Sequence, residues 1–143
     1  EFGRLARHVR FVERGARKLA RQSFHGMIVH GPKLERRQGF LFRLVDVANE
    51  LFVMAASCSR AAAMVREGHA EAKRAVELAD LLCRRSRRRI KASFKALWSN
   101  DDVVKYKVSK TVLTGQQAWL EQGLVQQVRR SIPKPVPAET ARG

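Results

Sequence analysis

The feature that most constrains this chain is helical periodicity along nearly its whole length. Apolar residues recur at three- and four-residue steps in four long segments, and no segment alternates as a half-buried β-strand would. The segments run from about Leu5 to Val29, from Pro32 to about Glu67, from about Ala70 to Leu97 and from Asp102 to about Arg129. Long helices with short connections predict an all-α fold, an antiparallel up-and-down bundle of about four long helices.

The domain organisation expected from this pattern is simple. Residues 1–130 are predicted to form a single helical bundle domain, and residues 131–143 a flexible tail rich in proline. The chain does not begin with Met, which indicates a piece of a larger protein. No window approaches the 18 uncharged apolar residues that a transmembrane helix requires.

The second segment is apolar nearly all round its middle, which is typical of a central helix or of a subunit interface. Its predicted inward stripe is Leu41, Leu44, Val45, Ala48, Leu51, Phe52, Ala55, Ser59 and Ala62, with Phe40, Phe42, Val47, Val53 and Met54 off that stripe. The third segment has a cleaner period, and its inward residues are predicted to be Ala75, Ala79, Leu82, Cys83, Ser86, Ile90, Phe94 and Leu97. In the fourth segment, Gly115 is expected to permit a close helix crossing.

The charge balance favours an acidic partner. Twenty-nine Lys and Arg oppose thirteen Asp and Glu, a formal net charge of +16, which suits nucleic acid, anionic lipid or an acidic protein face. Much of this charge lies in one run, LLCRRSRRRIKASFKALW, which has no acidic residue. Its basic residues are Arg84, Arg85, Arg87, Arg88, Arg89, Lys91 and Lys95. We interpret the run as the solvated face of a helix that offers contact with an anionic surface.

No constellation in the sequence predicts an active site, a cofactor site or a metal site. The four histidines lack the spacing that directs two imidazoles at one metal, and no CxxC, GxGxxG or GxSxG motif is present. Asp46 and Glu50 lie four residues apart, and we expect them to pair with arginines rather than to hold a metal. Cys58 and Cys83 are interpreted as small buried core residues in a reducing cytoplasm.

A long block of the chain resembles a known family. The segment KLERRQGFLFRLVDVANELFVMAASCSRAAAMVREGHAEAKRAVELADLLCRRSRRRIKASFKALWSN is similar to the C-terminal helical domain of the larger acyl-CoA dehydrogenases, the very-long-chain type and its bacterial relatives. Its most specific pieces are RLVDVANELFVMAASCSRA and the REGH turn, and LARHVRFVERGARKLARQSFHG fits the helix that leads into that domain. The resemblance covers about Leu5 to Gly123.

This resemblance implies a function for a larger parent enzyme. Such enzymes oxidise a fatty acyl-CoA to the trans-2-enoyl-CoA with FAD and a glutamate base, and both belong to the catalytic core upstream of this domain. The resemblance therefore implies no cofactor in this part of the chain and FAD in the parent enzyme. It also implies that the extra domain serves oligomerisation, as a dimer, packs with the rest of the dehydrogenase chain and contacts an anionic membrane.

Two alternatives stay open at this point. A stand-alone basic bundle could bind nucleic acid or an acidic protein, although no aromatic–basic interleaving, short helix-turn-helix or zinc module supports nucleic acid. A pure oligomerisation module could carry its charge only for solubility. The expected location is the cytoplasm, at the periphery of the inner face of the membrane.

Overall fold

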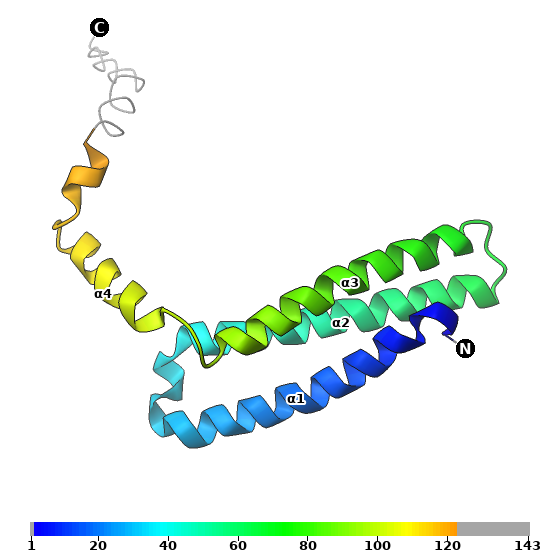
Figure 1. The fold of residues 1–143 in the computed structure, drawn as a ribbon, viewed down its shortest axis with the longest axis horizontal. Helices are drawn as coiled ribbons and strands as arrows, with labels where there is room; N and C mark the ends of the chain where they lie inside the picture. The colour runs from blue at the N-terminus through cyan, green and yellow to red at the C-terminus, as the bar shows by residue number, and fades with distance from the viewer. Residues whose placement is uncertain (1, 123–143) are drawn as a thin grey trace, which may run out of the picture. The chain divides into compact units, whose positions relative to one another are not determined.

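The chain is described by a computed structural model that covers residues 2–122. The prediction of an all-α fold is confirmed, because these residues form helices and contain no strand (Figure 1). The four α-helices within them are α1 (Ala6–His30), α2 (Gln38–Arg66), α3 (Ala72–Ala96) and α4 (Asp102–Leu113). Three short 3-10 helices accompany them, at Gly3–Leu5, Gly31–Arg36 and Ala118–Glu121. The predicted tail, 131–143, lies outside the described residues.

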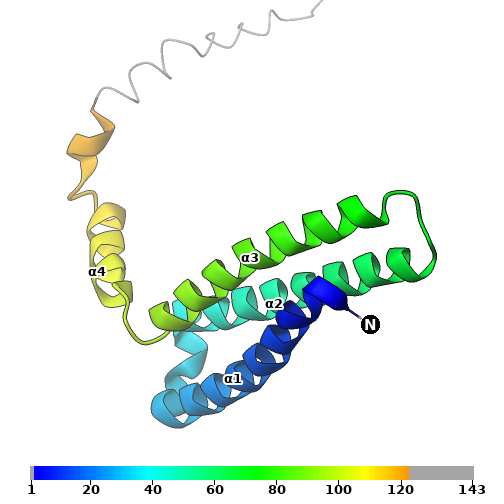
Figure 2. The ribbon, with the colours of Figure 1, turned by 45° about the vertical axis from the view of Figure 1, so that its right-hand side comes forward.

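The chain divides into two compact units, Glu1–Asn100 and Asp101–Gly143. Within the first unit, α1, α2 and α3 run antiparallel, and α2 packs against both of the other helices (Figures 1 and 2). The first unit is therefore a three-helix bundle with α2 as its central helix. A fourth helix in the same bundle, and a single domain over residues 1–130, remain predictions.

The core of the first unit lies along α2 and α3. The inward face predicted for the third segment is confirmed, since six of its eight positions are buried and the other two, Ala75 and Leu82, are half-buried against the core. The six buried positions are Ala79, Cys83, Ser86, Ile90, Phe94 and Leu97. From α2 the core receives Phe40, Val47, Leu51, Met54, Cys58 and Ala61, and Leu5 joins it from the N-terminal turn.

The inward stripe predicted for α2 is partly wrong. Val47 and Met54, placed off the stripe, are fully buried, whereas Val45 and Phe52, placed on it, are 52% and 72% exposed. The helix is apolar on almost every side, so its period does not select one face. Successive residues of a helix are 100° apart around its axis. On this scale the observed core face of α2 is rotated by about a quarter of the circumference from the predicted stripe.

Two glycines of α1 set how closely that helix lies to α2. A Cβ at Gly15 would be 2.6 Å from Cδ2 of Leu51, and a Cβ at Gly26 would overlap the ring of Phe40. Both glycines are buried. The α1 backbone therefore lies directly against the Leu51 and Phe40 side chains of α2 at these two turns, and a larger residue would force those side chains to move.

The end of α4 differs from the prediction. The helix stops at Leu113, and Gly115 follows it with φ +76°. The Gln116 N–H donates to the Thr111 carbonyl, and the Gly115 N–H donates to the Val112 carbonyl, each over 3.0 Å. This is a Schellman C-cap, so Gly115 ends the helix, and the prediction of a mid-helix close crossing is wrong.

The substitution Gly26→Ala tests the close contact between α1 and α2. Overpacking costs about 1–3 kcal/mol, and the gain in helix propensity returns up to about 1 kcal/mol. We expect the free energy of unfolding in urea to fall by about 1–2 kcal/mol, measured by circular dichroism. In a Phe40→Ala background the same change is expected to stabilise, because only the propensity gain remains. An equal loss in both backgrounds would show that Phe40 does not set the contact.

Candidate functional site

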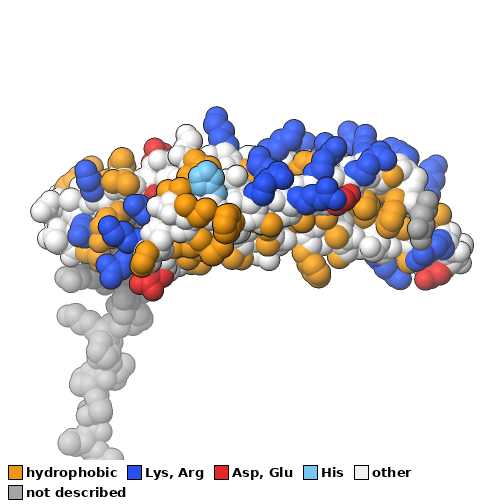
Figure 3. Space-filling view, turned by 90° about the horizontal axis from the view of Figure 1, so that it is seen from below, with side chains coloured by type: hydrophobic (Ala, Val, Ile, Leu, Met, Phe, Trp, Pro, Cys, Tyr) orange, Lys and Arg blue, Asp and Glu red, His pale blue; other side chains and the backbone are white. Residues whose placement is uncertain are grey.

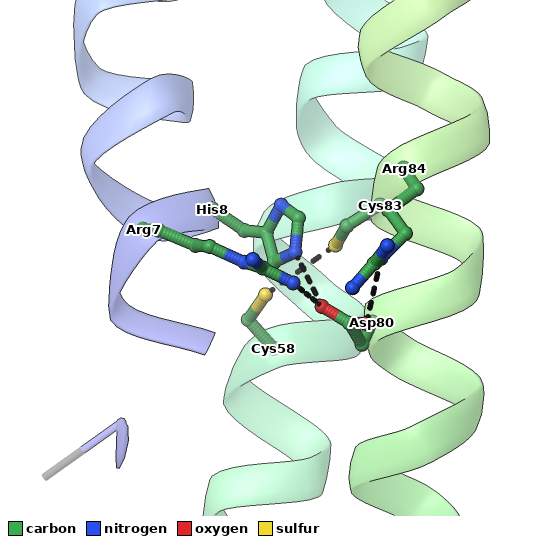
Figure 4. Close-up of polar contacts among 6 residues, drawn as sticks. All are labelled: Arg7, His8, Cys58, Asp80, Cys83 and Arg84. Carbon is green, nitrogen blue, oxygen red and sulfur yellow. Dashed lines mark hydrogen bonds and ion pairs between the residues drawn. The ribbon is translucent and has the colours of Figure 1, made fainter. Parts of the chain in front are cut away.

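One buried carboxylate connects α1 with α3. Asp80 of α3 is 6% exposed, and its Oδ1 accepts hydrogen bonds from Nη2 of Arg7 at 2.5 Å and from Nε2 of His8 at 2.8 Å. Its Oδ2 accepts one from Nε of Arg84, one turn further along α3, at 2.8 Å. Figure 4 shows the three donors converging on this carboxylate from two helices.

The three donors determine the ionisation of Asp80. The hydrogen bond from His8 first, and then the one from Arg7, hold the pKa of this carboxyl well below its usual range, although burial acts in the opposite direction. Because an ionised carboxylate only accepts hydrogen bonds, Nε2 of His8 carries a hydrogen. The His8 side chain is fully buried and its Nδ1 has no partner among the described residues. The His8 and Asp80 side chains are buried, the Arg7 and Arg84 side chains are half exposed at its edge, and we assign the cluster a structural role.

Two thiols lie beside this cluster. Sγ of Cys58 on α2 and Sγ of Cys83 on α3 are 3.6 Å apart, and both side chains are buried, as predicted (Figure 4). Burial raises the pKa of the Cys58 thiol and raises that of Cys83 to about 12. Both groups are therefore protonated thiols at neutral pH, and they are poor nucleophiles.

An aromatic cluster lies at the end of the bundle opposite the Asp80 cluster. The Trp98 ring lies 5.2 Å from the ring of Phe40 and 5.1 Å from that of His25, and it stacks on His30 at 6.0 Å. The indole N–H of Trp98 donates to Oε1 of Gln22 over 2.5 Å. Trp98, which follows α3, thus packs against the C-terminal part of α1. His25 and His30 contribute to this packing.

The basic residues of α3 fall into three groups: those on the side of α1, one that pairs with α2, and those outside these contacts. Arg84 pairs with Asp80, and the Arg87 guanidinium lies 4.7 Å from the centre of the Phe11 ring on α1. On the other side, Arg89 pairs with Glu50 of α2 at 2.7 Å. The remaining four residues are exposed: Arg85, Arg88, Lys91 and Lys95.

The paired carboxylates of α2 hold no metal site. Glu50 forms the expected ion pair, with Arg89, while Asp46 lines a groove beside it. Over residues 2–122, no three His, Cys, Asp or Glu side chains gather closely enough to bind a metal ion. None of the helices in that part of the chain is long and apolar enough to cross a membrane.

Comparison with known proteins identifies the class of domain. A family model described as "ACAD9/ACADV, C-terminal domain" matches residues 4–117. The chain belongs to this family, the C-terminal domains of acyl-CoA dehydrogenases, and the predicted resemblance is confirmed.

Individual relatives agree with this assignment. The chain is 47% identical over 127 residues to the probable acyl-CoA dehydrogenase FadE10 of Mycobacterium tuberculosis, and equally to that of Mycobacterium bovis. The alignment covers 89% of this chain and 20% of each relative, so the chain spans a fifth of the length of these proteins. No solved structure matches the chain.

The Asp80 cluster was not predicted from the sequence. Its signal was present, since His8 falls at helical spacing with Leu5 and Val12, and Asp80 stands beside the core residues Ala79 and Cys83. Polar residues at core positions need partners. Which residue pairs with which, across more than seventy positions, follows only from the packing of α1 against α3.

The substitution Asp80→Asn tests the structural role of the cluster. It leaves buried donors facing a neutral amide, and we expect a loss on the order of 2 kcal/mol in the free energy of unfolding at pH 7. A lowered carboxyl pKa stabilises the fold above the ordinary aspartate pKa, and this stabilisation is lost as pH falls through the lowered value. The difference from the original chain should therefore be constant between about pH 5 and 7 and shrink below about pH 4.

A matched control is Glu77→Gln, which removes the same charge from an exposed position of α3. It is expected to change stability by less than about 0.5 kcal/mol. Equal effects of the two substitutions at pH 7, measured by urea unfolding, would contradict the structural role of Asp80.

Proposed function

We propose that this chain is the non-catalytic C-terminal helical domain of an FAD-dependent acyl-CoA dehydrogenase that oxidises a fatty acyl-CoA to the 2-enoyl-CoA. The observation that carries the proposal is the family match over residues 4–117. The FAD pocket and the glutamate base would belong to the rest of the parent chain, which is the first partner of this domain. The polar cluster that the described residues bury around Asp80 is assigned a structural role. Binding of nucleic acid is not favoured, because the family assignment accounts for the helical pattern without it.

The proposed role of the domain is oligomerisation, through an exposed apolar surface. We define the apolar α2 face as Phe42, Val45, Phe52 and Val53, which are 62%, 52%, 72% and 41% exposed. Their spacing along α2 places them on one side of the helix, opposite the buried Val47, Leu51 and Met54. Asn49 lies between the pair Phe42 and Val45 and the pair Phe52 and Val53 on this side of the helix. Large exposed apolar side chains on one helix face favour a protein interface, and we propose that two copies pair through it as a dimer.

Light scattering coupled to size exclusion tests this interface. The 143-residue chain is expected to elute as a dimer, and Phe52→Asp to elute as a monomer, because a charge in an apolar contact is desolvated without a partner. The matched control is Leu78→Asp on α3, at a residue that is 67% exposed and outside the apolar α2 face. It should remain a dimer. A monomeric original chain, or dissociation by both substitutions alike, would contradict the proposal.

A second proposed role is peripheral contact with an anionic membrane on the cytoplasmic side. Lys and Arg side chains gather along one edge of the face in Figure 3, with hydrophobic side chains exposed beside them. Arg84 and Arg89 are also exposed, but they form ion pairs with Asp80 and Glu50, and Arg87 lies over the Phe11 ring, which leaves Arg85 and Arg88 as the exposed arginines of the run outside these contacts. Each basic residue near an anionic leaflet contributes about 1 kcal/mol. We therefore assign bilayer contact chiefly to Arg85 and Arg88.

Co-sedimentation with vesicles tests the membrane role. Phosphatidylserine-containing vesicles are expected to bind the chain at low salt, and binding should weaken steeply as salt rises. The double substitution Arg85→Gln/Arg88→Gln should weaken it by about tenfold or more. Equal sedimentation with neutral phosphatidylcholine vesicles, or none with either at low salt, would remove this role.

A further inference from the structure

A groove of about 450 Å³ lies between α1 and α3, away from the Asp80 cluster. Its floor is apolar and consists of Phe11, Gly15, Ile90 and Phe94. Its rim carries four cations, Arg14 and Lys18 from α1 and Lys91 and Lys95 from α3. We propose that this groove binds an anionic amphiphile, a phosphate ester on an acyl chain, with the phosphate at the rim and the start of the chain on the floor.

The charge of the rim favours an anion. None of the eight residues that line the groove is acidic. The two cations on each helix are four residues apart, a spacing at which like charges repel. A phosphate between the helices would relieve this repulsion on both sides and accept hydrogen bonds from several donors at once.

The floor favours an apolar chain next to that anion. Ile90 and Phe94 are 1% and 8% exposed and continue into the core. The Lys18 ammonium stands 4.5 Å from the centre of the Phe94 ring, so charge and apolar surface meet within the groove. A ligand that joins both chemistries matches this arrangement better than inorganic phosphate alone.

The size of the groove suits a small ligand. Its lining spans residues 11–18 on α1 and 90–95 on α3, about 12 Å and 9 Å of helix at about 1.5 Å per residue. The volume lies within the range of about 300–1,000 Å³ of small-molecule sites.

The groove between α2 and α3, of about 460 Å³, provides an internal comparison. It is lined by residues of both signs, Asp46, Glu50 and Arg89 among them, and its arginine is already paired with Glu50. An anion gains nothing from a cation that has a carboxylate partner. The chemistry of the α1–α3 groove is therefore not a general property of the spaces between these basic helices.

The test uses the full 143-residue chain and dihexanoyl phosphatidic acid below its micelle concentration, measured by isothermal titration calorimetry. We expect binding that Lys18→Gln/Lys95→Gln weakens by about tenfold or more. The control Lys33→Gln/Lys73→Gln removes the same charge from two exposed lysines that do not line the groove, and it should weaken binding by less than about twofold. Circular dichroism confirms that both variants keep their helices.

Three further probes distinguish the sources of the signal. Dihexanoyl phosphatidylcholine and inorganic phosphate should each bind at least about tenfold more weakly than the phosphatidic acid, since one lacks the net charge and the other the chain. Equal weakening by both double variants, equal binding of inorganic phosphate, or binding only to phosphatidic acid vesicles and not to the monomeric lipid would overturn the proposal. Because these tests need neither the dimer nor the parent activity, their failure would leave the proposed function standing.

Discussion

Asp80 places a negative charge in the contact between α1 and α3, where a carboxylate is stable only with hydrogen-bond donors and cations around it. Arg7 and His8 supply them from α1 and Arg84 from its own helix. Because charge-assisted hydrogen bonds have narrow geometry, they hold the two helices in one register along their length. The positions of the other contacts in the first unit depend on this register. They include the glycine contacts between α1 and α2 and the groove between α1 and α3.

The bundle presents surfaces with different chemistry on its different sides. α2 carries the core on one side and the apolar α2 face on the other, while α1 and α3 carry most of the positive charge. The proposed dimer would use the apolar α2 face, and the proposed contact with an anionic membrane would use the basic side. A net charge of +16 attracts any anion to the surface. The proposed binding of a single amphiphile depends instead on the four cations at the rim of the α1–α3 groove.

The sequence predicted the elements better than their contacts. Helices α1, α2 and α3, and the inward face of α3, followed from periodicity, because α3 is apolar on one side only. The face of α2 did not, since Val45 and Phe52 are as apolar as Val47 and Met54. The end of α4 was missed because a glycine in a helical pattern reads equally as a close contact or as a C-cap. The pairing of His8 with Asp80, and the groove that joins α1 to α3, depend on tertiary register, which local patterns do not encode.

The central claim is that the apolar α2 face is an interface in the assembled enzyme. Hydroxyl-radical footprinting of the complete dehydrogenase chain, with each oxidation rate normalised to the unfolded chain, measures this directly. The account predicts that Phe42 and Phe52 are protected while Leu78 and Leu81 of α3, 67% and 64% exposed, are oxidised freely. Equal oxidation of all four side chains in the assembled enzyme would contradict it.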